Sequence, residues 1–277
     1  MAIKTKVFIL ILNYRHYKDT LKCIGALKRS DLPSNTKILV LDNSENDISV
    51  EKIGKKYPRI TIIQHSHNLG FAGGNNPGID HALKKGATHV LIINPDVTVP
   101  HRFLKPLLSS LKQNNLDMIA PAIKHKQKDQ WFYGLEGLVN FTNGKATHLN
   151  LKKIPSKDIR PAKFVTFACV LISSSVFKKI GLLNEKYFMY LEDVDFCLRA
   201  SCLGFKIGLD PQVIVKHKTS SSFSRPTKKL KISFHSQLIF ISSWLKFPQK
   251  IYAYLYTIVH YVYLYFLWTY HFYKYSR

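Results

Sequence analysis

The chain has 277 residues, and a hydrophobic content of 46% excludes a globally disordered protein. Its 41 lysines and arginines against 17 acids give a formal charge of +24, which favours anionic partners: phosphorylated small molecules, anionic lipid or nucleic acid. Four cysteines without a CxxC pair predict reduced thiols in a cytoplasmic protein rather than a zinc site or disulfides.

Apolar runs alternate with stretches of helical period through the first 120 residues. Strands are predicted over 6–14, 36–44, 59–65 and 88–96, and helices over 16–30, 47–57, the later part of 70–86, and 101–114. The strands are apolar on both faces, as in a parallel sheet that is covered by helices on both sides. The pattern therefore predicts an α/β fold with a mostly parallel sheet.

Three further segments follow along the chain. Short strands and loops are expected over 121–163, a buried strand with a short helix over 163–181, and a helix from about Glu192. We expect three units: a sheet domain over 1–215, a basic flexible loop over 216–238, and an aromatic helical tail over 239–277.

Polar side chains follow the predicted strands where each strand ends. In parallel α/β sheets, ligands collect beyond the carboxyl ends of the strands. Ordinary turn chemistry explains any one of these residues, because Asn and Asp favour turns. The residues at these ends are Asn13, Tyr14, Asp42, Asn43, Asn68, Asn94 and Asp96.

The glycine-rich segment "HNLGFAGGNNPGID" allows a close backbone approach to a ligand at the start of a helix, where an anion is favoured. It contains neither a GxGxxG fingerprint nor a Walker lysine, which excludes those two nucleotide motifs. Tight helix–sheet packing is the alternative explanation. Pro77 is expected in the first helical turn, where its missing N–H costs nothing.

Two residues suggest a cation site. Asp96 in "INPDV" has the carboxylate oxygen that a hard divalent cation prefers, and the neutral imidazole of His217 can supply a further ligand. A turn acid and a surface histidine are the alternatives.

The segment "YLEDVDFCLRA" (190–200) crowds Glu192, Asp193 and Asp195 into one helical turn. Acids in a first turn are stabilised by the helix dipole, and Asp195 can pair with Arg199 four residues later. Three acids among aromatic and apolar neighbours also suit a general base, because burial and like charges tune their pKa values.

Together, "ILNYRHYKDTLKCIGAL", "VLDNSENDIS", "HNLGFAGGNNPGI", "INPDV" and "GLLNEKYFMYLEDVDFCLRASCLGFKI" resemble the inverting family 2 glycosyltransferases, and most closely the rhamnosyltransferase-like subgroup. The resemblance covers residues 5 to about 220. It implies the GT-A fold, a nucleotide-sugar donor and a divalent cation, Mg²⁺ or Mn²⁺.

The resemblance also implies roles for individual residues. Asp193 would be the catalytic base, and Asp96 with His217 would hold the metal on the donor diphosphate. The residues that would bind the donor are Asn13, Tyr14, Asp42, Asn68, Asn75, Asn94 and Glu192.

The tail over 251–270 has no Lys, Arg, Asp or Glu and is rich in tyrosine. Tyrosine prefers the headgroup boundary, so a helix lying on an anionic membrane surface is the first expectation, and a helix that spans the membrane is the second. Packing on the core, or on a second subunit in a homodimer, is the alternative. The expected location is cytoplasmic, peripheral on the inner face of the cell membrane.

The expected function is transfer of a sugar, with rhamnose as first candidate, from a dTDP- or UDP-sugar to a glycan or lipid-linked acceptor in surface polysaccharide synthesis. The alternative is a non-catalytic GT-A scaffold, against which the presence of Asp42, Asp96 and Asp193 argues. Nucleic acid is not expected as a partner, because no recognition motif accompanies the positive charge.

Overall fold

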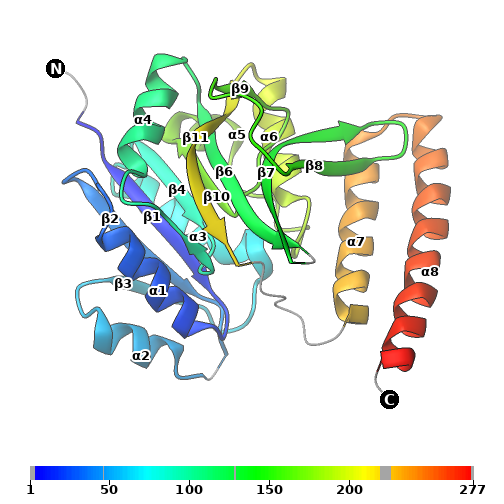
Figure 1. The fold of residues 1–277 in the computed structure, drawn as a ribbon, viewed down its shortest axis with the longest axis horizontal. Helices are drawn as coiled ribbons and strands as arrows, with labels where there is room; N and C mark the ends of the chain where they lie inside the picture. The colour runs from blue at the N-terminus through cyan, green and yellow to red at the C-terminus, as the bar shows by residue number, and fades with distance from the viewer. Residues whose placement is uncertain (1–3, 46, 128, 219–225, 276–277) are drawn as a thin grey trace.

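The computed structural model describes residues 4–45, 47–127, 129–218 and 226–275, which form one 11-stranded sheet with helices on both faces (Figure 1). The sheet order is β3 (Thr61–Gln64), β2 (Thr36–Asp42), β1 (Val7–Asn13), β4 (His89–Ile93), β10 (Cys169–Ser173), β6 (Met118–Gln127), β11 (Ile207–His217) and β5 (Val97–Thr98), with β7 (Gln130–Asn140) on β6, β8 (Lys145–Leu151) on β7 and β9 (Arg160–Pro161) on β11. The helices are α1 (Tyr17–Lys28), α2 (Ser49–Lys56), α3 (Gly70–Lys84), α4 (Leu104–Gln113), α5 (Ser174–Ile180), α6 (Glu192–Cys202), α7 (Pro226–Trp244) and α8 (Gln249–Tyr275).

The predicted α/β class is confirmed, and the first four strands in the sheet order are parallel to one another. Beyond β4, among the strands of the described residues, the β6–β11 pair alone is parallel, and the other pairs are antiparallel. The segment 121–163, expected as short strands and loops, instead contains the 11-residue strand β7. It returns to the sheet through hairpins, and hairpins produce antiparallel neighbours.

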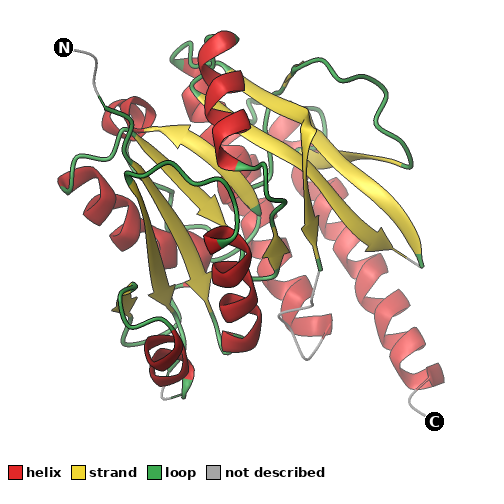
Figure 2. Cartoon of the chain, turned by 60° about the vertical axis from the view of Figure 1, so that its left-hand side comes forward, coloured by secondary structure: helices red, strands yellow, loops and turns green. Residues whose placement is uncertain are grey.

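Alternate residues of β1 enter two separate apolar layers. Val7, Ile9 and Ile11 pack with residues of α1 and α4, whereas Phe8 and Leu10 pack with residues of α3, α5 and α6. This is the period-two alternation of a strand that is buried on both faces. Figure 2 shows the helices on the two sides of the sheet. All four cysteines are free thiols, as predicted.

The glycine-rich segment is not a loop, because α3 already begins at Gly70. Pro77 therefore lies in the helix interior and not in its first turn, which corrects the expectation. A Cβ at Gly74 would stand 2.6 Å from the Asn43 amide nitrogen, and one at Gly78 would stand 2.7 Å from Leu41. These glycines let the helix approach β2 closely, so the packing explanation accounts for them.

The C-terminal helices α7 and α8 lie side by side at one flank of the sheet domain (Figure 1). Phe240 and Ile241 of α7 are fully buried in the domain core, and the Ser236 hydroxyl donates a 2.8 Å hydrogen bond to the Met189 carbonyl oxygen. Both ends of the segment 216–238, expected as a loop, belong to other elements, because β11 continues to His217 and α7 starts at Pro226. Residues 219–225 lie outside the described residues.

The tail helix α8 is 27 residues long, and it exposes a run of large apolar side chains. Across the described part of the chain, no helix combines the length and the hydropathy needed to cross a membrane.

Candidate active site

One cavity of about 1260 Å³ brings together residues from the strand ends, α6, α7 and α8. Seven of the residues predicted for the site line it, although they come from five separate parts of the sequence. These are Tyr14, Asn68, Asn94, Asp96, Glu192, Asp193 and His217. The proposed metal ligands and the proposed base therefore face the same space.

Three predicted donor-binding residues are buried beside this cavity instead of lining it. The Asn13 amide donates to Asp42 Oδ1 at 2.6 Å, and the Thr20 hydroxyl donates to Asn13 Oδ1 at 2.6 Å. The Asn75 amide donates to the Phe71 carbonyl oxygen at 2.9 Å. Their contact with a nucleotide stays a prediction.

The buried carboxylate of Asp42 is nevertheless incompletely satisfied. Its Oδ2 atom is inaccessible to solvent and accepts no hydrogen bond within the described residues. Buried polar groups are normally hydrogen-bonded, so this acceptor is an exception. Because the atom has no surface open to the cavity, contact of Asp42 with a base or ribose stays a prediction.

Asn43, next to Asp42, lines the cavity and links β2 to the start of α3. Its amide nitrogen donates to Asn68 Oδ1 at 3.2 Å and to the Gly70 carbonyl oxygen at 2.8 Å. Asn68 Oδ1 in turn accepts from the Gly70 N–H at 2.9 Å. The sequence places Asn43 among the polar residues at the strand ends without a role in donor binding, and the structure places it in the wall of the cavity.

Asp96 and His217 meet because β5 pairs with the end of β11, which sets Val97 opposite His217. Their Oδ1 and Nε2 atoms are 2.9 Å apart. Among the described residues no group of three or more His, Cys, Asp or Glu side chains could hold a metal. A carboxylate and an imidazole suit Mg²⁺ or Mn²⁺ when diphosphate oxygens and water complete the shell. The two residues therefore fit a cation that binds together with the donor.

The acidic cluster starts α6 after a turn of unusual backbone conformation. Tyr190 and Leu191 both have positive φ, at 75° and 66°, which L-residues adopt only where the surrounding structure holds them. The turn points the first residues of α6 toward the cavity, and three acids in the first helical turn are favoured by the dipole.

Asp193 is half-buried at the cavity wall, and its Oδ1 accepts the Val194 N–H at 2.8 Å. Burial raises the pKa of Asp193, while the neighbouring His148 and the backbone N–H groups of Val194 and Phe167 oppose the rise. Burial, and then the charge of Asp193, raise the pKa of Glu192 well above its usual range. The two adjacent acids therefore both have raised pKa values. The role of Asp193 as the base stays a prediction.

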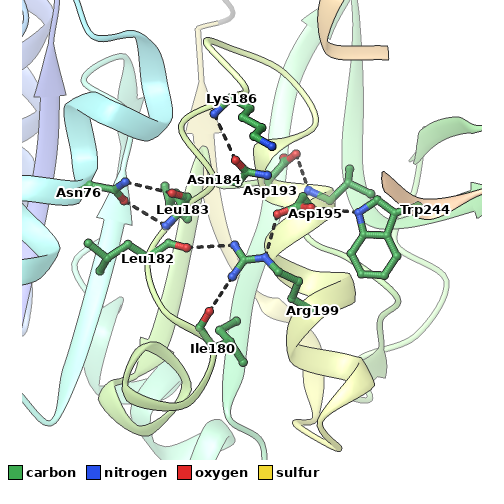
Figure 3. Close-up of polar contacts among 11 residues, drawn as sticks. Asn76, Ile180, Leu182, Leu183, Asn184, Lys186, Asp193, Asp195, Arg199 and Trp244 are labelled. Atoms are coloured by element: carbon green, nitrogen blue, oxygen red, sulfur yellow. Dashed lines mark hydrogen bonds and ion pairs between the residues drawn. The ribbon is translucent and has the colours of Figure 1, made fainter. Parts of the chain in front are cut away.

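The third acid, Asp195, has a different role (Figure 3). Its Oδ2 accepts from Arg199 Nε at 2.8 Å, which confirms the expected pair, and its Oδ1 accepts from Trp244 Nε1 at 2.9 Å. Both oxygens are thus occupied inside the protein. Asp195 joins α6 to the C-terminal helix α7 and does not line the cavity.

Sequence reasoning missed a whole wall of the cavity, which the β7–β8 hairpin, α7 and α8 provide. The signal was a repeat of polar residues four positions apart, which places them on one helix face. The residues in this wall include Lys145, His148, Lys229, Ser233, Gln237, Tyr256, His260 and Tyr261.

Comparison with known proteins places the chain in a family. A family model described as glycosyl transferase family 2 matches residues 7–181. The hexosyltransferase Agl10 of low-salt glycan biosynthesis in Haloferax volcanii is 29% identical over 72% of this chain and 63% of its own length. The dTDP-rhamnosyl transferase RfbF of Shigella flexneri is 23% identical over 73% of this chain and 66% of its own length. The rhamnosyltransferase WbbL of Escherichia coli is 24% identical over 79% of this chain and 87% of its own length. The match thus spans less than two thirds of the length of the first two relatives.

Solved structures show the same fold. GalNAc-T7 with UDP, GalNAc and Mn²⁺ has a TM-score of 0.71 at 11% identity, over 92% of this chain and 50% of that one. TarS 1–349 of S. aureus has a TM-score of 0.59 at 14% identity, over 90% of this chain and 69% of that one. These likenesses establish the GT-A fold. Because the family model covers well over half of its length, the chain belongs to glycosyl transferase family 2.

Proposed function

We propose that the chain is an inverting glycosyltransferase that moves a sugar from a nucleotide-sugar to a glycan or lipid-linked acceptor in surface polysaccharide synthesis. The observation that supports this most is that Asp96 and Asp193 line one cavity. Its volume of about 1260 Å³ exceeds that of an ordinary single-ligand pocket, so a donor and an acceptor can share it.

The acid–base chemistry follows from Asp193. An acceptor hydroxyl is a weak nucleophile, and Asp193 takes its proton as the oxygen attacks the anomeric carbon of the donor sugar. The bond from that carbon to the diphosphate breaks, and the electron pair leaves with the nucleoside diphosphate. Attack from the face opposite the leaving group inverts the anomeric configuration. The raised pKa of Asp193 brings the base closer to neutrality, where proton transfer is most effective.

The donor would lie against the strand ends, with its base or ribose near Asp42 and its diphosphate near Asp96 and His217. A divalent cation bound there supplies positive charge to the departing diphosphate. The name of RfbF specifies a dTDP-rhamnosyl donor, and GalNAc-T7 was solved with UDP. We therefore rank a dTDP-sugar, with rhamnose as the sugar, before UDP-sugars.

The direct test is release of nucleoside diphosphate from a panel of dTDP- and UDP-sugars, with and without Mn²⁺. Asp96→Asn is expected to weaken Mn²⁺-dependent binding of the nucleoside diphosphate by at least about tenfold, the lower bound for disturbing a metal site. Asp129→Asn, the same change at an exposed carboxylate, should leave binding unchanged. Donor binding without any turnover would support the scaffold alternative, and equal binding by Asp96→Asn would remove Asp96 from the metal site.

We further propose that α8 attaches the protein to the inner face of the cell membrane. Its exposed apolar side chains recur at helical spacing along one stripe, namely Ile251, Leu255, Val259, Val262 and Phe266. Lys246 and Lys250 precede the stripe and can meet anionic headgroups. Such a stripe with basic flanks is typical of a helix that lies in the interface.

Partitioning into anionic vesicles tests this attachment. Leu255→Asp with Val259→Asp is expected to lower the partition coefficient by about tenfold or more, because the two charges must leave water with the helix. Ile48→Asp, an exposed aliphatic residue on another element, serves as the control. Unchanged partitioning of the α8 variant would rule out this stripe as the membrane contact.

A further inference from the structure

The α5–α6 loop, residues 181–191, ends immediately before the acidic cluster of α6. Its last two residues, Tyr190 and Leu191, are the ones with positive φ. Backbone strain of this kind persists only where the surrounding structure fixes the conformation. The contacts that hold the α5–α6 loop therefore also decide where Asp193 stands.

The side chain of Asn76, in the middle of α3, makes three of these contacts. Its amide nitrogen donates to the Leu183 carbonyl oxygen at 3.0 Å, and its Oδ1 accepts from the Leu183 N–H at 3.0 Å (Figure 3). The same nitrogen donates to Glu185 Oε1 at 2.7 Å. Asn76 is 4% exposed and does not line the cavity. One buried amide thus satisfies both backbone groups of a loop residue 107 positions away.

The first turn of α3 holds the other end of the loop. The Phe71 N–H, one of the helix N–H groups without an intrahelical partner, donates to the Phe188 carbonyl oxygen at 2.6 Å. This approach requires glycine at position 70, because a Cβ at Gly70 would clash with the same carbonyl oxygen. Gly70, Gly73 and Asn76 are spaced by three and share a helix face. The glycine-rich segment therefore packs on β2 with one face and on the α5–α6 loop with another.

The opposite side of the loop is held by the helices that follow it. Arg199 of α6 donates to the Ile180 and Leu182 carbonyl oxygens, and Ser236 of α7 donates to the Met189 carbonyl oxygen. Figure 3 shows the start of the loop between Asn76 and Arg199. Because the start of α3 lines the cavity, the loop connects the side proposed for the donor to the helix of the proposed base.

We propose that Asn76 is a positioning residue for Asp193: by holding the α5–α6 loop on α3, it sets the distance between the bound donor and the base. This inference rests on the proposed function and adds a residue that lies outside the cavity. Transfer needs the acceptor oxygen between Asp193 and the anomeric carbon, with the reacting atoms about 3–3.5 Å apart. A released loop would let Asp193 move away while the donor contacts at the strand ends stay in place.

The test variant is Asn76→Asp, which keeps the shape of the side chain and the acceptor for the Leu183 N–H. It replaces the donating nitrogen by an oxygen that faces the Leu183 carbonyl and the Glu185 carboxylate. The turnover number at saturating donor is expected to fall by about 100-fold, the cost of misplacing a reacting group by ~1 Å. The dissociation constant of the nucleoside diphosphate should stay close to that of the wild type.

Two further variants separate positioning from simple loss of stability. In Asn76→Asp/Glu185→Gln the glutamine amide can donate across the former 2.7 Å contact, so part of the turnover number should return. Ser110→Ala removes another long-range hydrogen bond, from the Ser110 hydroxyl to Asp210 Oδ2 at 2.7 Å, between α4 and β11. It should lower the free energy of unfolding and keep the turnover number of the wild type.

Native-state hydrogen exchange adds a readout that needs no turnover, because amides in a loosened segment exchange faster. Asn76→Asp is expected to speed exchange over 181–195, and Ser110→Ala is not. A wild-type turnover number for Asn76→Asp overturns the proposal, and so does a loss confined to the affinity for the nucleoside diphosphate. If the wild type releases no nucleoside diphosphate from any donor, the proposed function fails. Exchange at 192–195 then decides the inference: faster exchange in Asn76→Asp supports it, and unchanged exchange overturns it.

Discussion

Asp193→Asn is expected to lower the turnover number of sugar transfer by about 100- to 10,000-fold, the usual contribution of a positioned general base. The asparagine amide has the shape and size of the carboxylate, but it cannot take up the proton of the acceptor hydroxyl. Donor affinity should stay close to that of the wild type, since the donor contacts are assigned to the strand ends. Steady-state release of nucleoside diphosphate, with a separate titration of the donor, measures both quantities.

The pH dependence of the wild type gives a second readout of the same residue. Asp193 must be deprotonated to act, and burial raises its pKa. The rate should therefore rise with pH through that raised pKa, above the ordinary value for aspartate of about 4. Below this pKa the base is protonated and the rate falls. The residual activity of Asp193→Asn should lack this acidic limb.

The matched control is Asp80→Asn, which makes the same change on the exposed surface of α3. It should keep both the rate and the acidic limb. A wild-type rate for Asp193→Asn, or an acidic limb that persists in that variant, would remove Asp193 from the role of base. Glu192, the adjacent acid whose pKa is also raised by burial, would then be the next residue to change.

The sequence predicted well what depends on the chain order of strands and turns. Parallel strands bring their carboxyl ends to one edge, and so Tyr14, Asn68 and Asp96 meet in one cavity as expected. The pair of Asp195 and Arg199 was also predictable, because residues four apart face each other on a helix. These inferences need only local geometry.

Burial and long-range packing were harder to predict. Asp42 and Asn13 stand at strand ends like Tyr14, but their register sets them opposite each other, and they bond to each other below the cavity surface. The wall that α7 and α8 provide depends on contacts such as Gln237 with Gly144, 93 residues apart. Helical spacing can show which residues share a face, but it does not show which surface that face covers.

The largest expected loss of stability comes from Arg199→Met. Arg199 donates to Asp195 at 2.8 Å and also to the carbonyl oxygens of Ile180 and Leu182, at 2.8 Å and 3.0 Å (Figure 3). The Asp195 side chain is only 4% exposed. Removing the cation leaves a buried carboxylate whose remaining side-chain donor, within the described residues, is the Trp244 indole. Breaking such a pair costs about 3–5 kcal/mol of the free energy of unfolding.

Urea unfolding of a small set of variants distinguishes a buried charge from simple loss of packing. Asp195→Asn/Arg199→Met removes both charges and should recover a large part of the loss, because the penalty lies in the uncompensated carboxylate. Trp244→Phe keeps the apolar ring but removes one donor, at a cost of about 1–3 kcal/mol. If Arg199→Met and the double variant are equally destabilised, the charge is not the cause. If Arg199→Met costs less than about 1 kcal/mol, the pair behaves like an exposed one. Asp195 lies two residues from Asp193, and its hydrogen bond to Trp244 is the link to α7. If Trp244→Phe lowers the free energy of unfolding but leaves the turnover number unchanged, this link is not needed to position the base.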